Sequence, residues 1–143
     1  QAIALLNEAM IRMAQAPDRG AAEATALLGQ SVDLCLQGQS SALVQSALEV
    51  ATALSCARRE WQTALEFWSW AEAYARHSGL RRDPADERFL QPFVAQLSAR
   101  QGAAAFNRAL QSADTQAPDV VLSRIQAWLS ASAAGSVRRP QTA

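Results

Sequence analysis

The stretch EWQTALEFWSW, residues 60–70, places three tryptophans and one phenylalanine in a chain that is otherwise rich in alanine. Trp61, Ala64 and Trp68 follow the i, i+3, i+7 spacing of one face of an α-helix. A small residue between two tryptophans lets a second helix approach closely, while the indole rings fill the remaining volume. The stretch therefore predicts the centre of a helical core. Trp70 falls on another face of this helix, so a different part of the protein must pack over it.

Helical periodicity continues on both sides of this stretch, and no sustained alternation of apolar and polar residues indicates a strand. Seven helices are expected. They run from about Ile3 to Gln15, from about Ala21 to Leu36, through Leu43–Leu54, from about Trp61 to His77, from Pro84 towards Gly102, through Phe106 and Leu110, and through Val121–Leu129. The loops between them are short, which favours antiparallel neighbours. The fold class is therefore all-α, an array or bundle of helical hairpins.

Local signals mark where several of these helices begin and end. The candidate N-caps are Asp18, Ser40 or Ser41, and Asp83, which is followed by Pro84 at the first helical position. Gly79 is placed to end the aromatic helix in a left-handed conformation. Pro92 predicts a kink or a restart, because proline removes a helical hydrogen bond. We expect one helical domain over residues 1–134 and a frayed tail over residues 135–143.

Composition excludes several classes of function. The 13 basic and 13 acidic residues balance, which argues against direct binding of nucleic acid, because phosphate binding leaves a basic footprint. No apolar run of about 18 residues predicts a membrane span, and no signal peptide is recognisable. Cys35 and Cys56 are expected to be reduced and roughly 20 Å apart, as in a cytoplasmic protein. The chain begins at Gln1, and we expect it to be a piece of a longer protein.

No set of residues predicts catalysis or a cofactor. The single histidine, His77, is poorly placed to activate either cysteine, and its position suits a cation at the end of a helix. Metal-binding, phosphate-binding and dinucleotide-binding motifs are absent from the sequence. The doublets Arg81-Arg82 and Arg138-Arg139 are expected to be solvated surface. The chain is therefore predicted to be neither an enzyme nor a cofactor-binding protein.

The aromatic helix resembles the second helix of a tetratricopeptide repeat. Ala64, Trp68 and Ala71 match the Ala, aromatic, Ala series of such repeats, and Trp61 stands at the position of a tyrosine-like residue. The preceding helix, about Ser46 to Ala57, matches weakly. The resemblance implies a right-handed superhelix of antiparallel hairpins, capped by the C-terminal helices.

The segment from about residue 48 to 130 also resembles the C-terminal end of large bacterial transcriptional regulators. These carry a winged-helix DNA-binding domain, a STAND-type ATPase core and a tetratricopeptide-like array. The matching elements are Ala71-Glu72-Ala73, Pro84-Ala85-Asp86-Glu87-Arg88, Gly102 with Ala105-Phe106, and Val120–Leu129. Leu110 departs from the family, which often has tryptophan there. The resemblance implies a non-catalytic sensor or autoinhibitory segment of an ATP-dependent regulator.

Three hypotheses follow. The first is this regulatory segment, whose partners are other domains of the same chain or a protein. The second is a free-standing tetratricopeptide-like adaptor or chaperone module that binds a peptide or protein. The third is a helical bundle that binds a small molecule, or an enzyme subunit, with the aromatic helix as a pocket wall. In such arrays the first helix of each hairpin lines the groove, so the candidate contact residues are Ser46, Glu49 and Ala53, together with Trp70 on the surface.

Overall fold

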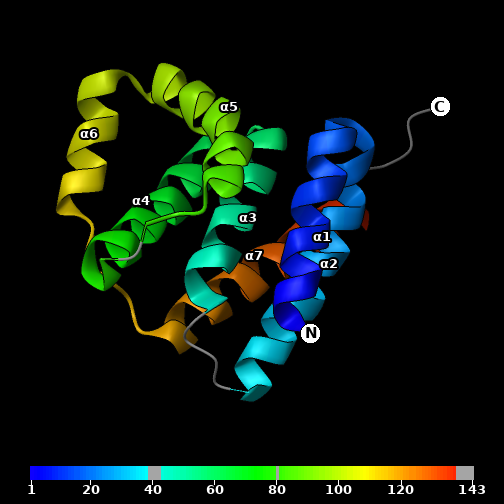
Figure 1. The fold of residues 1–143 in the computed structure, drawn as a ribbon. Coiled ribbons are helices and arrows are strands. Elements are labelled where there is room, and N and C mark those ends of the chain that lie inside the picture. Colours follow the sequence, from blue (N-terminus) through cyan, green and yellow to red (C-terminus); the bar gives the residue numbers. More distant parts are fainter. Residues whose placement is uncertain (39–42, 80, 138–143) are drawn as a thin grey trace.

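The structure is a computed structural model and describes residues 1–38, 43–79 and 81–137. Its helices are α1 (Ala2–Gln15), α2 (Pro17–Gly38), α3 (Val44–Ala57), α4 (Trp61–Ser78), α5 (Pro84–Gln101), α6 (Ala103–Ser112) and α7 (Pro118–Val137). No strand occurs among the described residues, so the predicted all-α class and its seven helices are confirmed there (Figure 1).

Helices α1 and α2 pack side by side and antiparallel, with Ala16 as the only residue between them. The Ser31 hydroxyl at one end of the pair donates to the carbonyl of Ala2, 3.2 Å away. At the other end, a Cβ atom on Gly20 would lie 2.1 Å from the carbonyl oxygen of Arg12. Only glycine permits this close approach, so the tight corner depends on that residue.

Helix α3 is the central helix of the molecule. Every residue from Ala47 to Cys56 is buried, which this run of small and medium side chains permits on all faces. The turn to α4 passes through Arg59, which adopts a positive φ of 59°. In α4, Ala64, Phe67 and Trp68 are buried, so the prediction that most of the aromatic cluster is core is confirmed.

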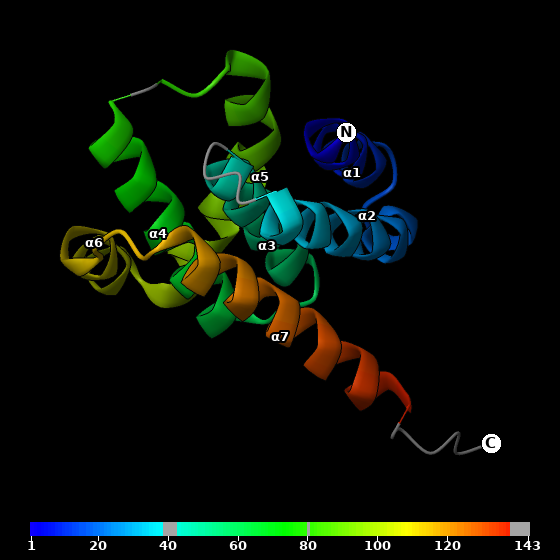
Figure 2. The same ribbon diagram turned by 90° about the horizontal axis from the view of Figure 1, so that it is seen from below.

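Helix α7 crosses the side of the molecule formed by α2 and α4 (Figure 2). Gln126 hydrogen-bonds Asp33, while Leu129 approaches Gly29, so α7 runs antiparallel to α2. Against α4, Trp128 donates to Glu60 at 2.8 Å and Arg124 pairs with Glu66 at 2.9 Å, which again is antiparallel.

The apolar face of α7 was anticipated from the sequence. Val121, Leu122, Ile125 and Trp128 are buried, and Leu129 packs against the core. The ring of Trp128 meets Phe67 edge-on, with centroids 5.2 Å apart, an arrangement that aromatic pairs prefer. The C-terminal helix thus completes the core around the aromatic stretch of α4.

Local signals located the start of α5 and the end of α4. Asp83 caps α5 by accepting a 2.8 Å hydrogen bond from the Ala85 amide, and Gly79 ends α4 with a left-handed φ of 68°. Asp18 was wrongly predicted as a cap, because α2 already begins at Pro17 and Asp18 lies in its first turn. No restart occurs at Pro92, since α5 continues through it.

The remaining boundary predictions concern segments that the structure describes in part. Leu43 occupies the N-cap position of α3, and the predicted caps Ser40 and Ser41 lie outside the described residues. Helix α7 extends to Val137, past the expected start of the tail at residue 135. Residues 138–143 lie outside the described part of the chain.

Candidate functional site: the groove between α1 and α5

An open groove lies between α1 and α5, both of which pack against α3. It consists of two adjoining depressions that share Ala14 and Phe89, with volumes of about 680 and 580 Å³. The larger one is lined by Met13, Ala14, Asp18, Cys56, Ala57, Arg59, Trp61, Arg88, Phe89, Pro92, Phe93, Gln96, Ala99 and Arg100. The smaller one is lined by Asn7, Met10, Ile11, Ala14, Asp83, Ala85, Asp86 and Phe89. Each depression falls in the size range of ligand-binding clefts.

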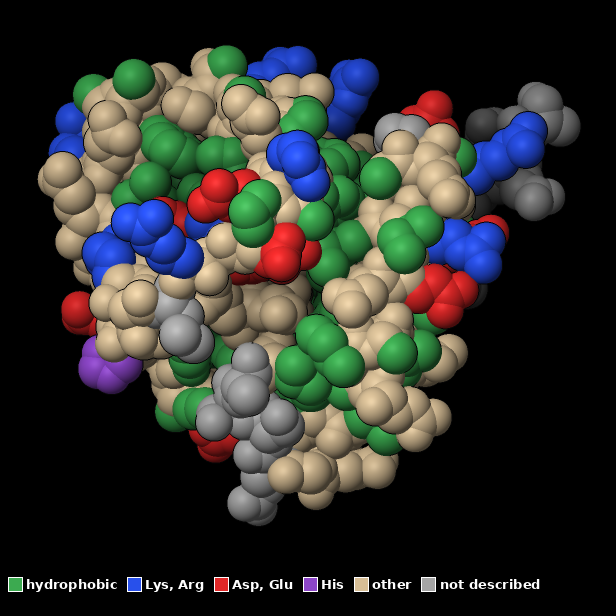
Figure 3. All heavy atoms as spheres, in the orientation of Figure 1, with side chains coloured by type: hydrophobic (Ala, Val, Ile, Leu, Met, Phe, Trp, Pro, Cys, Tyr) green, Lys and Arg blue, Asp and Glu red, His purple; other side chains and the backbone are tan. Residues whose placement is uncertain are grey.

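The walls of the groove are largely apolar. Figure 3 shows hydrophobic side chains in the hollow between α5 and α1. Ile11 on α1 lines the smaller depression and is 54% exposed. On the opposite wall the rings of Phe89 and Phe93 stack at a tilt, with centroids 5.5 Å apart. Exposed apolar surface in a concave setting is typical of interaction sites.

The two depressions differ in the charges that line them. Arg59, Arg88 and Arg100 line the larger depression, where Asp18 is the only acidic residue among those that the structure describes. None of the three arginines takes part in the ion pairs of the described residues. Arg100 lies over the ring of Trp61, 5.3 Å from its centroid. The larger depression therefore presents unpaired positive charge beside aromatic surface.

The smaller depression carries Asp83 and Asp86 and is lined by no basic residue. Burial raises the pKa of Asp86, and the negative charge of Asp83 raises it further, while Arg82 lowers it. Asp83 is held by its capping hydrogen bond to Ala85. The acidic side chains of the smaller depression thus belong to the start of α5.

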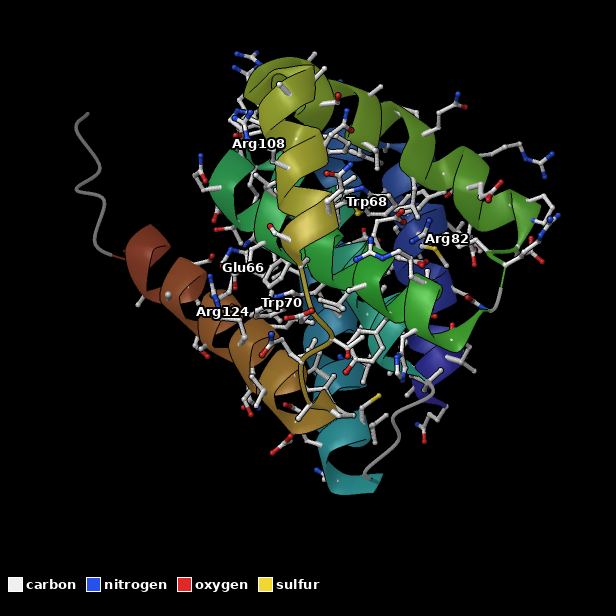
Figure 4. The ribbon with its side chains drawn as sticks, turned by 90° about the vertical axis from the view of Figure 1, so that its left-hand side faces the viewer. Glu66, Trp68, Trp70, Arg82, Arg108 and Arg124 are labelled. Atoms are coloured by element: carbon white, nitrogen blue, oxygen red, sulfur yellow. The ribbon has the colours of Figure 1, made fainter. Side chains whose placement is uncertain are left out.

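The start of α5 is anchored by Arg82, which lies just before the helix. Its guanidinium donates to Glu49 of α3, at 2.7 Å, and to Glu72 of α4. It also lies over the ring of Trp68, 4.6 Å from the centroid (Figure 4). One side chain therefore connects three helices. The prediction that Arg82 is solvated surface was wrong, because its side chain is only 13% exposed. Arg81, its neighbour, is exposed.

The pKa values of Glu49 and Arg82 are both raised, but for different reasons. Burial raises the pKa of Glu49, and Arg82 lowers it incompletely, so the net shift is upward. Burial lowers the pKa of Arg82, but its hydrogen bonds and charge interactions with Glu49 and Glu72 outweigh that effect and raise it. The physical reason is that one cation is shared by two carboxylates, and Glu49 is the more buried of the two.

The residues predicted to line a groove on α3 do not form an open surface. Ala53 is fully buried and Glu49 is 3% exposed and paired with Arg82. Ser46 is half-buried, and its role in binding stays a prediction. The part of α3 that does reach the groove is Cys56 with Ala57. Within the stripe that was expected to be exposed, Glu49 is covered by Arg82, which lies just before α5.

Trp70 was expected to need a cover from the C-terminal helices. It is half-buried, and its ring centroid lies 6.4 Å from that of Phe67. One turn further along α4, the Tyr74 hydroxyl donates to the carbonyl of Gln116. The segment between α6 and α7 therefore runs along this face of α4, beside Trp70 (Figure 4). A contact of Trp70 with a partner stays a prediction.

Other kinds of site are not apparent in the described ranges. No group of three or more histidine, cysteine or acidic residues is arranged to hold a metal ion there, and no described helix is long and apolar enough to cross a membrane. Cys35 and Cys56 are free and buried. Burial raises the pKa of the Cys56 thiol to about 12, which disfavours the nucleophilic thiolate.

Sequence reasoning missed most of the groove. No role in binding was assigned to Arg59, Arg88 or Arg100. Trp61 belongs to the aromatic helix that was considered as a possible pocket wall, while Asp18, Asp83 and Pro92 were named only as local helix signals. A signal existed in the alternation of Arg88, Phe89, Phe93 and Arg100 along α5, which mixes aromatic and basic residues on neighbouring turns.

Comparisons with protein-family models, with curated proteins and with solved structures gave no significant match.

Proposed function

We propose that the chain is a non-catalytic protein-interaction domain that binds a segment of a partner in the groove between α1 and α5. The observation that carries this proposal is the groove itself, with an apolar lining and three unpaired arginines around its larger depression. Surfaces that bind protein segments combine apolar anchoring positions with charged groups at the rim.

The arrangement of helices supports an interpretation as a tetratricopeptide-like array. Helices α1, α3 and α5 follow one another as neighbours on the groove side. In such arrays the first helix of each hairpin lines the binding surface, as the sequence resemblance implies. The α1–α2 pair and the long α4 packed on α3 fit the same scheme.

The narrower proposal is that this domain is the C-terminal sensor or autoinhibitory segment of a bacterial ATP-dependent transcriptional regulator. The order of sequence elements over residues 48–130 supports it. Sequencing the parent gene upstream of the codon for Gln1 tests it, with a P-loop and a winged-helix segment as the expected result. A start codon just upstream with neither motif favours the alternative, a free-standing adaptor or chaperone module.

The groove function is tested by selecting peptides from a displayed random library on the domain. Two variants on the same helix separate the groove from the rest of the surface. Ile11→Glu places a charge in the groove, while Ile3→Glu changes a residue of similar exposure, 44%, that does not line it. We expect the selected peptides to lose at least tenfold in affinity to Ile11→Glu and to bind Ile3→Glu as tightly as the unaltered domain.

Two outcomes contradict the proposal. Peptides whose affinity is the same for both variants bind elsewhere, and the groove is then not the site. If selection yields no peptide, but the anionic aromatic dye anilinonaphthalene sulfonate binds and Ile11→Glu weakens it, the groove belongs to a small-molecule site.

A further inference from the structure

The larger depression of the groove combines positive charge with apolar surface. We infer that it binds a partner segment in which acidic side chains flank an aromatic or aliphatic one. The carboxylates pair with Arg59 and Arg100, and the apolar side chain packs between the end of α3 and α5. This inference rests on the proposed function and specifies the chemistry of its partner.

Three parts of the fold enclose the larger depression. They are the corner between α1 and α2, the corner between α3 and α4, and one stripe of α5. The stripe recurs on every turn of the helix and consists of Arg88, Phe89, Pro92, Phe93, Gln96, Ala99 and Arg100. It extends about 18 Å along α5, which about five extended residues of a partner span. A segment along it reaches Phe89, the residue shared with the smaller depression, which Ile11 also lines.

Arg59 and Arg100 line the depression near Trp61. The Arg100 guanidinium lies over the Trp61 ring, 5.3 Å from its centroid, and Arg59 precedes Trp61 by two positions in the turn between α3 and α4. Both arginines are exposed, and neither takes part in an ion pair of the described residues. Because a guanidinium forms paired hydrogen bonds with a carboxylate, the two side chains suit the acidic groups of a partner.

Of the charged residues in the turn between α3 and α4, only Arg59 lines the depression. Its neighbours face α7, where Arg58 lies 5.0 Å from the centroid of the Trp128 ring and Glu60 accepts a hydrogen bond from the same indole. Arg59 itself has a φ of 59°, a left-handed conformation that glycine adopts freely and that strains other residues. Glycine forms such a turn without this strain, so what arginine adds here is its cation.

The charge of the larger depression favours an acidic partner. Three arginines line it, against one described acidic residue, Asp18. Arg88 contributes least to the positive potential, because the acidic residues in the first turn of α5 directly precede it. The potential is therefore most positive at Arg59 and Arg100, where we expect the acidic residues of the partner. Electrostatic complementarity of this kind selects one partner over others.

The apolar part of the depression lies where the end of α3 meets α5. The Cys56 thiol donates to the Phe93 carbonyl at 3.7 Å, so the two helices are in direct contact there. Met13 of α1 and Ala57 of α3 line the same depression. An aromatic or aliphatic side chain that packs here excludes water from the neighbouring pairs of carboxylate and arginine, and such pairs attract more strongly in a less polar surrounding.

A focused peptide library tests the inference. Each displayed peptide has twelve residues, with Phe, Trp or Leu at two central positions and Glu, Gln, Ser or Lys in equal proportion at the flanking positions. The library is selected on the domain, and sequencing before and after selection gives the ratio of Glu to Lys. We expect this ratio to rise at least tenfold, because lysine meets the arginines of the depression as a like charge.

Two variants in the depression and one matched control locate the contact. The most enriched peptide is measured by fluorescence anisotropy, and Arg59→Gly and Arg100→Gln are each expected to lower its affinity at least fivefold. The control Arg108→Gln changes an exposed arginine on α6, outside the groove (Figure 4), and should change the affinity less than twofold. Arg59→Gly should leave the melting temperature equal or higher, because glycine relieves the left-handed strain. Its weaker binding then has no origin in a damaged fold.

An unchanged or falling ratio of Glu to Lys overturns the inferred chemistry, as does a selection that enriches no peptide. The inference is also overturned if either variant in the depression binds the peptide as tightly as Arg108→Gln does. The proposed function is judged separately, by the random library and the pair Ile11→Glu and Ile3→Glu. Peptides from that library that depend on Ile11 but carry no acidic residue leave the groove as the binding site and overturn only the inference.

Discussion

Replacing Arg82 with methionine should destabilise the fold strongly, because Arg82 is the only cation among the described residues that pairs with the buried Glu49. The side chains of Arg82 and Glu49 are 13% and 4% exposed. Removing one partner of a buried ion pair typically costs about 3–5 kcal/mol, since a charge is left without compensation. Arg82 retains some contact with solvent, so we expect a loss of about 3 kcal/mol. That is a large share of the total stability of a domain of this size.

The assay is urea unfolding at pH 7, followed by helical circular dichroism and by tryptophan fluorescence. Arg81→Met is the matched control, because Arg81 is the exposed neighbour, and it should change the free energy of unfolding by less than about 0.5 kcal/mol. The double variant Glu49→Leu with Arg82→Met removes both charges and should recover most of the lost stability.

The dependence on pH identifies Glu49 as the cause. Its pKa in the folded protein is raised above the ordinary value of 4.5, and removing Arg82 raises it further. A carboxyl group of this kind contributes stability that is present below its unfolded pKa and is lost as the pH rises through its folded pKa. The deficit of Arg82→Met should therefore shrink between pH 7 and pH 5. A cost below about 1 kcal/mol at pH 7, or a deficit that does not change with pH, would refute the reasoning.

Three further predictions concern the core. Ile125→Ala should cost about 2–5 kcal/mol in urea unfolding, because Ile125 is fully buried between α7 and the rest of the core. Gly20→Ala should lower the melting temperature, since its Cβ would lie 2.1 Å from a backbone carbonyl. Gly38→Ala should instead leave it equal or higher, because nothing lies within 4 Å and alanine favours the helix by about 1 kcal/mol. Cys56 has a pKa of about 12 in the fold and is 2% exposed, so it should react with Ellman's reagent at pH 8 far more slowly in the folded protein than in denaturant. Rapid reaction without denaturant would contradict its burial.

The helices were predictable because their signals are local. The aspartate, proline and acidic residues around Asp83 specify a helix start by interactions within one turn. Gly79 specifies a helix end through its own backbone conformation. The period of the apolar residues also identified the buried face of α7. Asp18 was misjudged because Pro17 takes the first helical position, so that Asp18 lies inside the first turn and not before it.

The groove was not predictable in the same way, because its two walls lie far apart in the sequence. Ile11 and Phe89 are brought together only after α1 and α5 have both packed on α3. The role of Arg82 has the same origin, since its partner Glu49 is 33 positions away. A basic doublet has the same local sequence whether it lies in solvent or in a buried ion pair. Tertiary packing decides whether such a doublet is solvated or buried, and the spacing of residues along the sequence does not reveal that packing.

The structure separates what completes the fold from what remains available to a partner. On the side of α2 and α4, α7 covers the apolar surface. There Trp128 donates a hydrogen bond to Glu60, and Arg124 forms an ion pair with Glu66. On the side of α1 and α5, apolar side chains and three arginines remain without such a match among the described residues. Arg82 holds the start of α5 in place there at the cost of burying Glu49. That cost is understandable if α5 must keep a fixed distance from α1, because a preorganised groove binds its partner without first having to order its walls.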